Sequence, residues 1–196
     1  MVRSGEDLTS LDLCRAELDG ERFEDCRLVG ADLSEAVLRR CTFERCNLSG
    51  ADLGLLQATG CAFLGCRFER TRLFDALLED SKLTGSTFVR AELRTLRVRG
   101  GDWSWVVARG EDLRGVSLAG LRLAEADLSG ADLREADLSR ADLSHARLRD
   151  AKLSGADLRG ARLDGCDVDL VQWQGVRIDL AQAVLLARAR GAVVEG

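Results

Sequence analysis

The sequence predicts a repeat fold, a slender column whose chain turns a corner every five residues. Residues 126–165 form eight consecutive blocks of five, and each block opens with alanine and carries leucine third. A helix needs apolar residues about 3.6 positions apart and a strand needs them two apart, so a strict period of five fits neither. The chain also contains no proline that would interrupt such a path.

The apolar third position continues in one frame far beyond these eight blocks. It runs from Leu8 to Ile178, and only Ala58 and Ala108 are small. The first position of each block is usually alanine or cysteine, so we expect two side chains of every block to point inward. Repeats of this kind bury apolar surface only by stacking on their neighbours, so stability should accumulate block by block.

The block motif resembles the consensus A(D/N)LXX of the pentapeptide repeat proteins, and the resemblance covers nearly the whole chain. It implies an all-β fold, a right-handed quadrilateral parallel β-helix in which four blocks make one coil, followed by a short C-terminal α-helix. On this basis residues 1–178 form the β-helix. Residues 179–196 form a C-terminal helix and short strand that serve dimerisation and capping.

Six of the seven cysteines occupy the inward first position that alanine holds elsewhere, while Cys14 falls in an outward position. A buried free cysteine behaves as a small apolar residue. We therefore favour packing over a disulfide or metal site for these six: Cys26, Cys41, Cys46, Cys61, Cys66 and Cys166. The same frame aligns Phe23, Phe43 and Phe63 in one interior column.

Residues 94–111 depart most from the motif. Gly101 stands at an alanine position, and Glu111 is expected to point inward. One interpretation is a distorted coil. The other is an outward excursion of residues 101–110, which would preserve the frame because ten is a multiple of five. We favour the distorted coil, and in that frame Trp105 points outward, either as a contact residue or as a cover for a corner.

The frame ends after Ile178, and the tail predicts a helix. Asp179 is a plausible N-cap, residues 180–190 contain strong helix formers, and Gly191 suits the C′ position. Ala192–Val194 could add a short strand. The helix has more apolar surface than one capping face needs, so we expect a two-fold homodimer. Its expected interface residues are Trp173, Leu180, Val184, Leu185, Leu186, Val193 and Val194.

Composition excludes several classes of function. The net charge of −5 argues against direct nucleic-acid binding, which favours a basic stripe. No run of about 18 apolar residues could cross a membrane, and the N-terminus lacks the apolar core of a signal peptide, so we expect a cytoplasmic protein.

The sequence also lacks the groups that catalysis requires. His145 is the only histidine and is expected to face outward. The aspartates recur with the period instead of converging on one pocket. Neither a metal-ligand spacing nor a phosphate-binding glycine motif is present. We therefore expect no enzyme activity, no cofactor and no metal.

The length and the tail resemble the Qnr-type quinolone-resistance branch and its mycobacterial relative, and the absence of frame-breaking loops favours the mycobacterial type. This resemblance implies a homodimer that mimics DNA, binds DNA gyrase or topoisomerase IV, and confers resistance to fluoroquinolones or other gyrase poisons. The alternative is a generic scaffold for another protein–protein interaction. Candidate partner-binding residues on an acidic wall are Asp32, Glu35, Asp52, Asp132 and Glu135.

Overall fold

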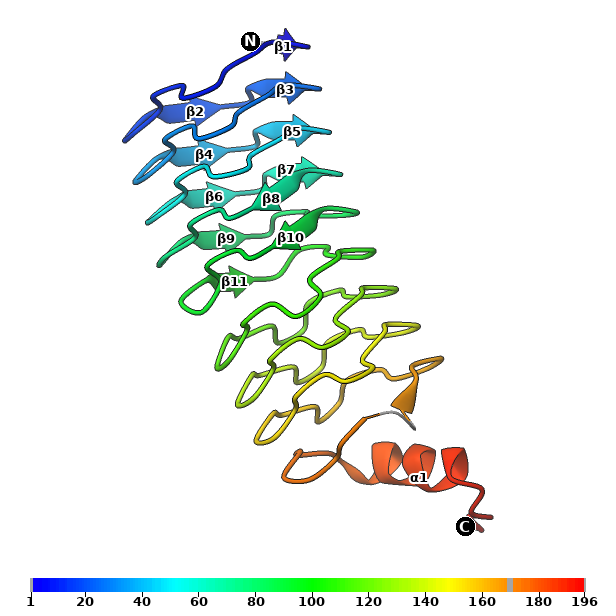
Figure 1. Cartoon of the computed structure of the whole chain (residues 1–196). Coiled ribbons are helices and arrows are strands. Elements are labelled where there is room, and N and C mark those ends of the chain that lie inside the picture. Colours follow the sequence, from blue (N-terminus) through cyan, green and yellow to red (C-terminus); the bar gives the residue numbers. More distant parts are fainter. Residues whose placement is uncertain (1, 169–170, 196) are drawn as a thin grey trace.

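The computed structural model describes residues 2–168 and 171–195. The chain winds into a column of stacked coils that ends in one helix (Figure 1). Parallel pairing joins residues twenty positions apart, from Val2 with Arg22 to Asp157 with Arg177. Because twenty residues are four blocks of five, the column has four faces. The predicted quadrilateral parallel β-helix with a C-terminal helix is confirmed.

We number the faces by the buried residue of one coil: Phe23 lies on face 1, Leu28 on face 2, Leu33 on face 3 and Leu38 on face 4. Face 1 carries β1 (Val2–Ser4), β3 (Arg22–Glu24), β5 (Thr42–Glu44) and β7 (Ala62–Leu64). Face 2 carries β8 (Arg67–Glu69) and β10 (Thr87–Val89). Face 4 carries β2 (Glu17–Asp19), β4 (Val37–Arg39), β6 (Gln57–Thr59), β9 (Leu77–Glu79) and β11 (Arg97–Arg99). Face 3 is joined by single-residue bridges.

The corners are made by the fifth residue of each block, which adopts a left-handed backbone. Gly30 has a φ of 64°, and Glu35 and Arg40, which carry side chains, have φ values of 57° and 52°. A left-handed residue costs about 1–2 kcal/mol unless it is glycine. The ladders on either side of each corner offset that cost. From residue 5 to residue 165, Thr95 is the only fifth-position residue without a positive φ.

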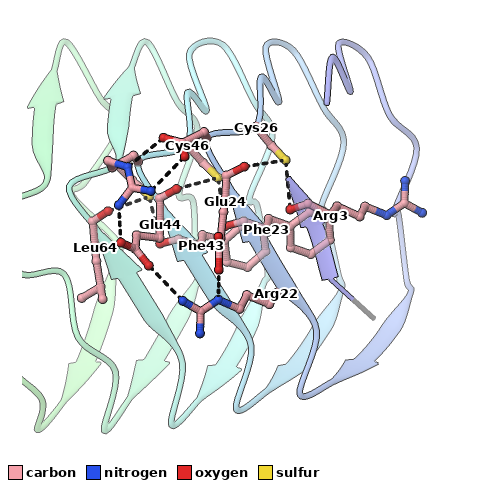
Figure 2. A network of polar contacts seen from close by, with 12 residues as sticks. Arg3, Arg22, Phe23, Glu24, Cys26, Phe43, Glu44, Cys46 and Leu64 are labelled. Atoms are coloured by element: carbon pink, nitrogen blue, oxygen red, sulfur yellow. Dashed lines mark hydrogen bonds and ion pairs between the residues drawn. The ribbon is translucent and has the colours of Figure 1, made fainter. Parts of the chain in front are cut away.

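The interior is filled by stacked rings and thiols. The rings of Phe23 and Phe43 stack 4.7 Å apart (Figure 2). Phe63 continues the column, 4.9 Å from Phe43. The Cys46 thiol donates to the carbonyl oxygen of Phe23 in the coil below, at 3.3 Å. Burial raises the pKa of Cys61 to about 11, so this thiol stays protonated. The interior aromatic column and the packing role of the first-position cysteines agree with the sequence.

The segment 101–110 stays inside the column. Asp102 pairs with Lys82 and Arg122, and Val107 pairs with Thr87 and Asp127, all at the usual separation of twenty. The in-frame coil is therefore confirmed, and the outward excursion is wrong. Trp105 lies at a corner with 55% of its surface exposed, as the frame predicts.

The tail forms α1 (Leu180–Ala189), with Asp179 as the N-cap in a capping box. The Gln182 side chain is buried and donates to the carbonyl oxygen of Ala161 at 2.9 Å, so the helix covers the last coil. At the other end, Gly191 has a φ of 85°, and its N–H donates to Arg188 in the manner of a Schellman motif. The predicted strand at Ala192–Val194 is wrong, because residues 192–195 follow this turn without forming a strand. The described part of the chain holds no helix with the length and apolarity that a bilayer crossing requires.

Candidate partner-binding surface

The outer faces are where this molecule can meet a partner, because the inward side chains are packed against one another. Leu28, Leu33, Leu38 and Phe43 have no solvent-exposed surface. Across residues 2–168 and 171–195, no group of three histidine, cysteine or acidic residues is arranged to hold a metal ion. Any recognition by the described column must therefore use the side chains at the second, fourth and fifth block positions.

The five predicted acidic residues all lie on face 3, in two groups. Asp32, Glu35 and Asp52 form the lower group, and Asp132 and Glu135 form the upper group. The coils between the two groups carry basic residues on the same face, including Arg72 and Arg94. The structure thus brings the five residues to one side of the column but not into one continuous patch.

The lower carboxylates have local roles as well as outward charge. Asp32 accepts hydrogen bonds from the Ser34 N–H and hydroxyl at 2.9 and 2.6 Å, and these bonds hold its pKa below the usual range. The Arg15 guanidinium, 2.9 Å from Glu35, lowers the pKa of that carboxyl in the same way. Asp52 pairs with the arginine of the next coil at 2.8 Å. Arginine side chains therefore partly neutralise Glu35 and Asp52, whereas Asp32 is held by uncharged groups.

The upper group is more open to solvent at its corner. Asp132 pairs with Arg134 at 2.6 Å, a hydrogen bond that lowers the pKa of the aspartate, and it lies 3.6 Å from Arg114. Glu135 is exposed and forms no ion pair within the described residues. Asp32 also forms no ion pair but is only partly exposed, so Glu135 is the one candidate that is both exposed and outside any ion pair of the described residues.

Two apolar side chains on face 3 were missed by the sequence reasoning. Phe74 is 55% exposed and Leu55, one coil below, is 46% exposed. The signal was available, because Phe74 occupies the fourth position and Leu55 the fifth, and both positions face outward. Leu55 shares its block with Asp52 of the lower group, and Phe74 lies between the two acidic groups, so both add exposed apolar surface to this face.

The residues predicted for a dimer interface divide into three sets. Leu180 and Val193 are 82% and 86% exposed, so nothing in the described chain covers them. Leu185, Leu186 and Trp173 are partly buried against the core of their own chain. The remaining two, Val184 and Val194, are half-buried.

The sequence reasoning also missed an ion pair on face 2 that has a buried carboxylate. The Asp127 side chain is 6% exposed and receives a hydrogen bond from the Arg109 Nε at 2.6 Å, with Arg147 at 3.4 Å. Burial works against ionisation of Asp127, but the bonds from Arg109 and Ser129 outweigh it and hold the pKa at about 2.

This shift makes stability depend on pH. Because the folded pKa of about 2 lies below the ordinary value of 3.8, ionised Asp127 stabilises the fold above about pH 4. That contribution is lost as the pH falls towards 2, and it amounts to about 2 kcal/mol. We expect Asp127→Asn to destabilise the protein at pH 7 and to flatten the fall in stability below pH 4. Urea unfolding at both pH values measures this, and Asp150→Asn, at an exposed corner, should change neither.

The comparisons with known proteins agree with this architecture. The family model for pentapeptide repeats matches residues 16–54, 112–150 and 131–168. Over 113 residues the chain is 39% identical to the pentapeptide repeat protein MfpA of Mycobacterium tuberculosis, a match that covers 58% of this chain. The match spans 51% of MfpA, about half of that relative's length.

Two solved structures share the fold over the whole chain. Both are trypsin-treated forms of QnrB1, described as a plasmid-mediated fluoroquinolone resistance protein. One has a TM-score of 0.88 at 24% identity and is covered over 98% of its length. The other has a TM-score of 0.76 at 22% identity and is covered over 99%. The repeated motif, the twenty-residue ladder and these matches lead to one conclusion: the chain belongs to the pentapeptide repeat family.

Proposed function

We propose that this protein mimics DNA and binds DNA gyrase, with topoisomerase IV as a second target, and thereby confers resistance to fluoroquinolones or other gyrase poisons. The observation that supports this most is the packed column, which offers side chains to a partner only on its outer faces. QnrB1 matches this column over the full length of the chain. Within each acidic group of face 3, the block positions repeat at intervals of one coil, about 4.8 Å. Regularly spaced carboxylates on the outside of a column resemble the regular charge of a duplex.

The proposed action is occupation of a DNA-binding surface in the cytoplasm, without turnover. A supercoiling assay with purified gyrase over a concentration series tests it. We expect inhibition at micromolar protein, or rescue of supercoiling when a fluoroquinolone is present. If neither effect is seen, the proposal is wrong. A pull-down that recovers another protein and no gyrase subunit would then support the generic scaffold.

Glu135 provides a sharper test of the acidic face. We expect Glu135→Lys to weaken gyrase inhibition about fivefold, because it replaces an exposed negative charge of face 3 that has no ion pair with its opposite. Glu125→Lys is the matched control, because it makes the same charge change on face 1, half a coil away. The backbone is nearly the same at the two corners, with a φ of 58° at Glu125 and 61° at Glu135. Equal inhibition constants for the two variants would remove face 3 from the proposed interface.

We also propose a homodimer formed through α1 and the residues that follow it. The support is the exposure of Leu180 at the start of α1 and of Val193 in the segment after it, while Gln182 of the same helix is buried against the last coil. Leu180→Asp should give a monomer by light scattering, because its side chain touches little of its own chain. Leu55→Asp, which also places a charge at an exposed leucine, should leave the dimer intact. A dimer that persists in Leu180→Asp would contradict this interface.

A further inference from the structure

The ladder that holds the column together is interrupted at one level on two faces. On face 3, bridges join Arg72 to Glu92 and Asp112 to Asp132, but within this fully described stretch none joins Glu92 to Asp112. Face 4 is interrupted at the same level, between β11 and Ser117. In Figure 1 the coil that follows β11 stands farther from it at one edge than other neighbouring coils do.

The opposite faces remain continuous at this level. Faces 1 and 2 keep their bridges through residues 101–110, from Lys82 through Asp102 to Arg122 and from Thr87 through Val107 to Asp127. The break is therefore a wedge, open on faces 3 and 4 and closed on faces 1 and 2. On face 3 it forms a depression of about 580 Å³, lined by Phe74, Ala91, Glu92, Leu93, Arg94, Thr95 and Asp112.

The Glu111 side chain bridges the two coils at one end of the wedge. Alanine occupies its inward position in neighbouring coils, but here the carboxylate is 5% exposed and accepts the N–H groups of Arg90 and Ala91 at 2.7 and 2.9 Å. In the regular ladder a fifth-position N–H such as that of Arg70 donates to the backbone of the next coil, here at 2.8 Å to Val89. The Glu111 side chain thus replaces backbone contacts and keeps the coils apart.

Three further residues depart from the regular geometry around the wedge. Thr95 is β-branched and does not adopt the left-handed corner. Gly101 has a φ of 107° at an inward position. Trp103 places an indole where the coils below and above have leucine, and its buried N–H has no partner among the described residues. Thr95 lies on face 3, where the ladder is open, whereas Gly101 and Trp103 lie on face 1, where the bridges remain.

We propose that the column is jointed here: the coils on either side rock about the intact ladders of faces 1 and 2, and this motion opens and closes the wedge on faces 3 and 4. The lower and upper acidic groups of face 3 lie on opposite sides of the joint. Rocking therefore changes the distance and angle between them. This last consequence rests on the proposed function, since it makes the joint a means of fitting face 3 to a partner's surface.

Cross-linking across the wedge tests the joint directly. Arg97 and Ser117 face each other across the opening on face 4, whereas Gln57 and Leu77 are paired within an intact ladder of the same face. Each pair is replaced by cysteines in a Cys14→Ser background, and a methylene-bridged bis-methanethiosulfonate is used as a short cross-linker. We expect the wedge pair to react to completion but at least about tenfold more slowly than the control, because minor states are populated at roughly 10% or less.

Two results would overturn the joint. A wedge pair that never cross-links means a rigid opening, and a wedge pair as fast as the control means that no opening exists in solution. Glu111→Ala supplies a second arm, since it frees Arg90 and Ala91 to resume the backbone ladder and should bring the wedge pair to the control rate. If that variant does not fold, the control pair in the same background will fail to cross-link. The comparison of the two pairs without Glu111→Ala then tests the joint by itself.

Amide hydrogen exchange adds a readout on the unmodified chain. The Leu93 and Gly100 N–H groups have no ladder acceptor in the described structure, whereas their counterparts Leu53 and Gly60 donate to the next coil at 2.8 and 2.9 Å. We expect much faster exchange at the first pair, and equal protection would contradict the wedge. No topoisomerase is present in any arm, so failure of the joint and failure of the proposed function are separate results.

Discussion

Replacement of Gly101 by alanine is expected to destabilise the protein by about 3 kcal/mol or more. A Cβ at this position would lie 2.1 Å from the backbone oxygen of Ser81, in the coil below, and the φ of 107° is one that residues with side chains rarely adopt. Because the obstructing atom belongs to a laddered backbone, it cannot move aside without breaking face 1. Chemical denaturation followed by circular dichroism measures the loss.

Gly115→Ala is the matched control for this substitution. Gly115 also has a positive φ, 68°, but a Cβ there would meet nothing within 4 Å. Many residues with side chains occupy this fifth position elsewhere in the column, so we expect a cost of about 1 kcal/mol. If the two variants unfold at the same denaturant concentration, the close approach of Gly101 to Ser81 does not limit stability.

Phe43→Ala should have the largest effect among the core substitutions, about 3–5 kcal/mol. Its ring is fully buried and stacks between Phe23 at 4.7 Å and Phe63 at 4.9 Å, so truncation leaves a cavity that the two neighbouring coils cannot fill. Phe74→Ala removes the same atoms from an outward position that is 55% exposed and should change stability by about 0.5 kcal/mol or less. Equal losses for the two variants would contradict the assigned inward frame.

The regular part of this fold could be read from the sequence because one rule repeats. Each block has an inward first and third residue, so the position of Phe43 or Cys46 follows from its number alone. The helix was equally predictable, because Asp179 and Gly191 carry the local cap chemistry that ends a helix. The strand at Ala192–Val194 was not, since its formation depends on where the turn at Gly191 directs the chain.

The sequence identified the segment that contains the wedge but not the faces on which the ladder opens. Gly101 and Glu111 break the motif, and they mark the right segment. That the ladder opens on faces 3 and 4 and not on the others depends on which backbone groups the Glu111 carboxylate reaches, which is a three-dimensional fact. The acidic face shows the same limit: the frame places Asp52 and Glu135 on one side, but the period does not show that arginine neutralises one and leaves the other without an ion pair.

The twenty-residue ladder also governs how such a chain can change in length. Loss or gain of twenty residues removes or adds one whole coil, and all the side chains above it keep their original direction. Loss of five would turn the entire upper part by a quarter revolution, so that the carboxylates now above Asp112 would face a different side from those below. Duplication or deletion of a whole coil therefore preserves the face on which each side chain lies, whereas duplication or deletion of a single block changes it.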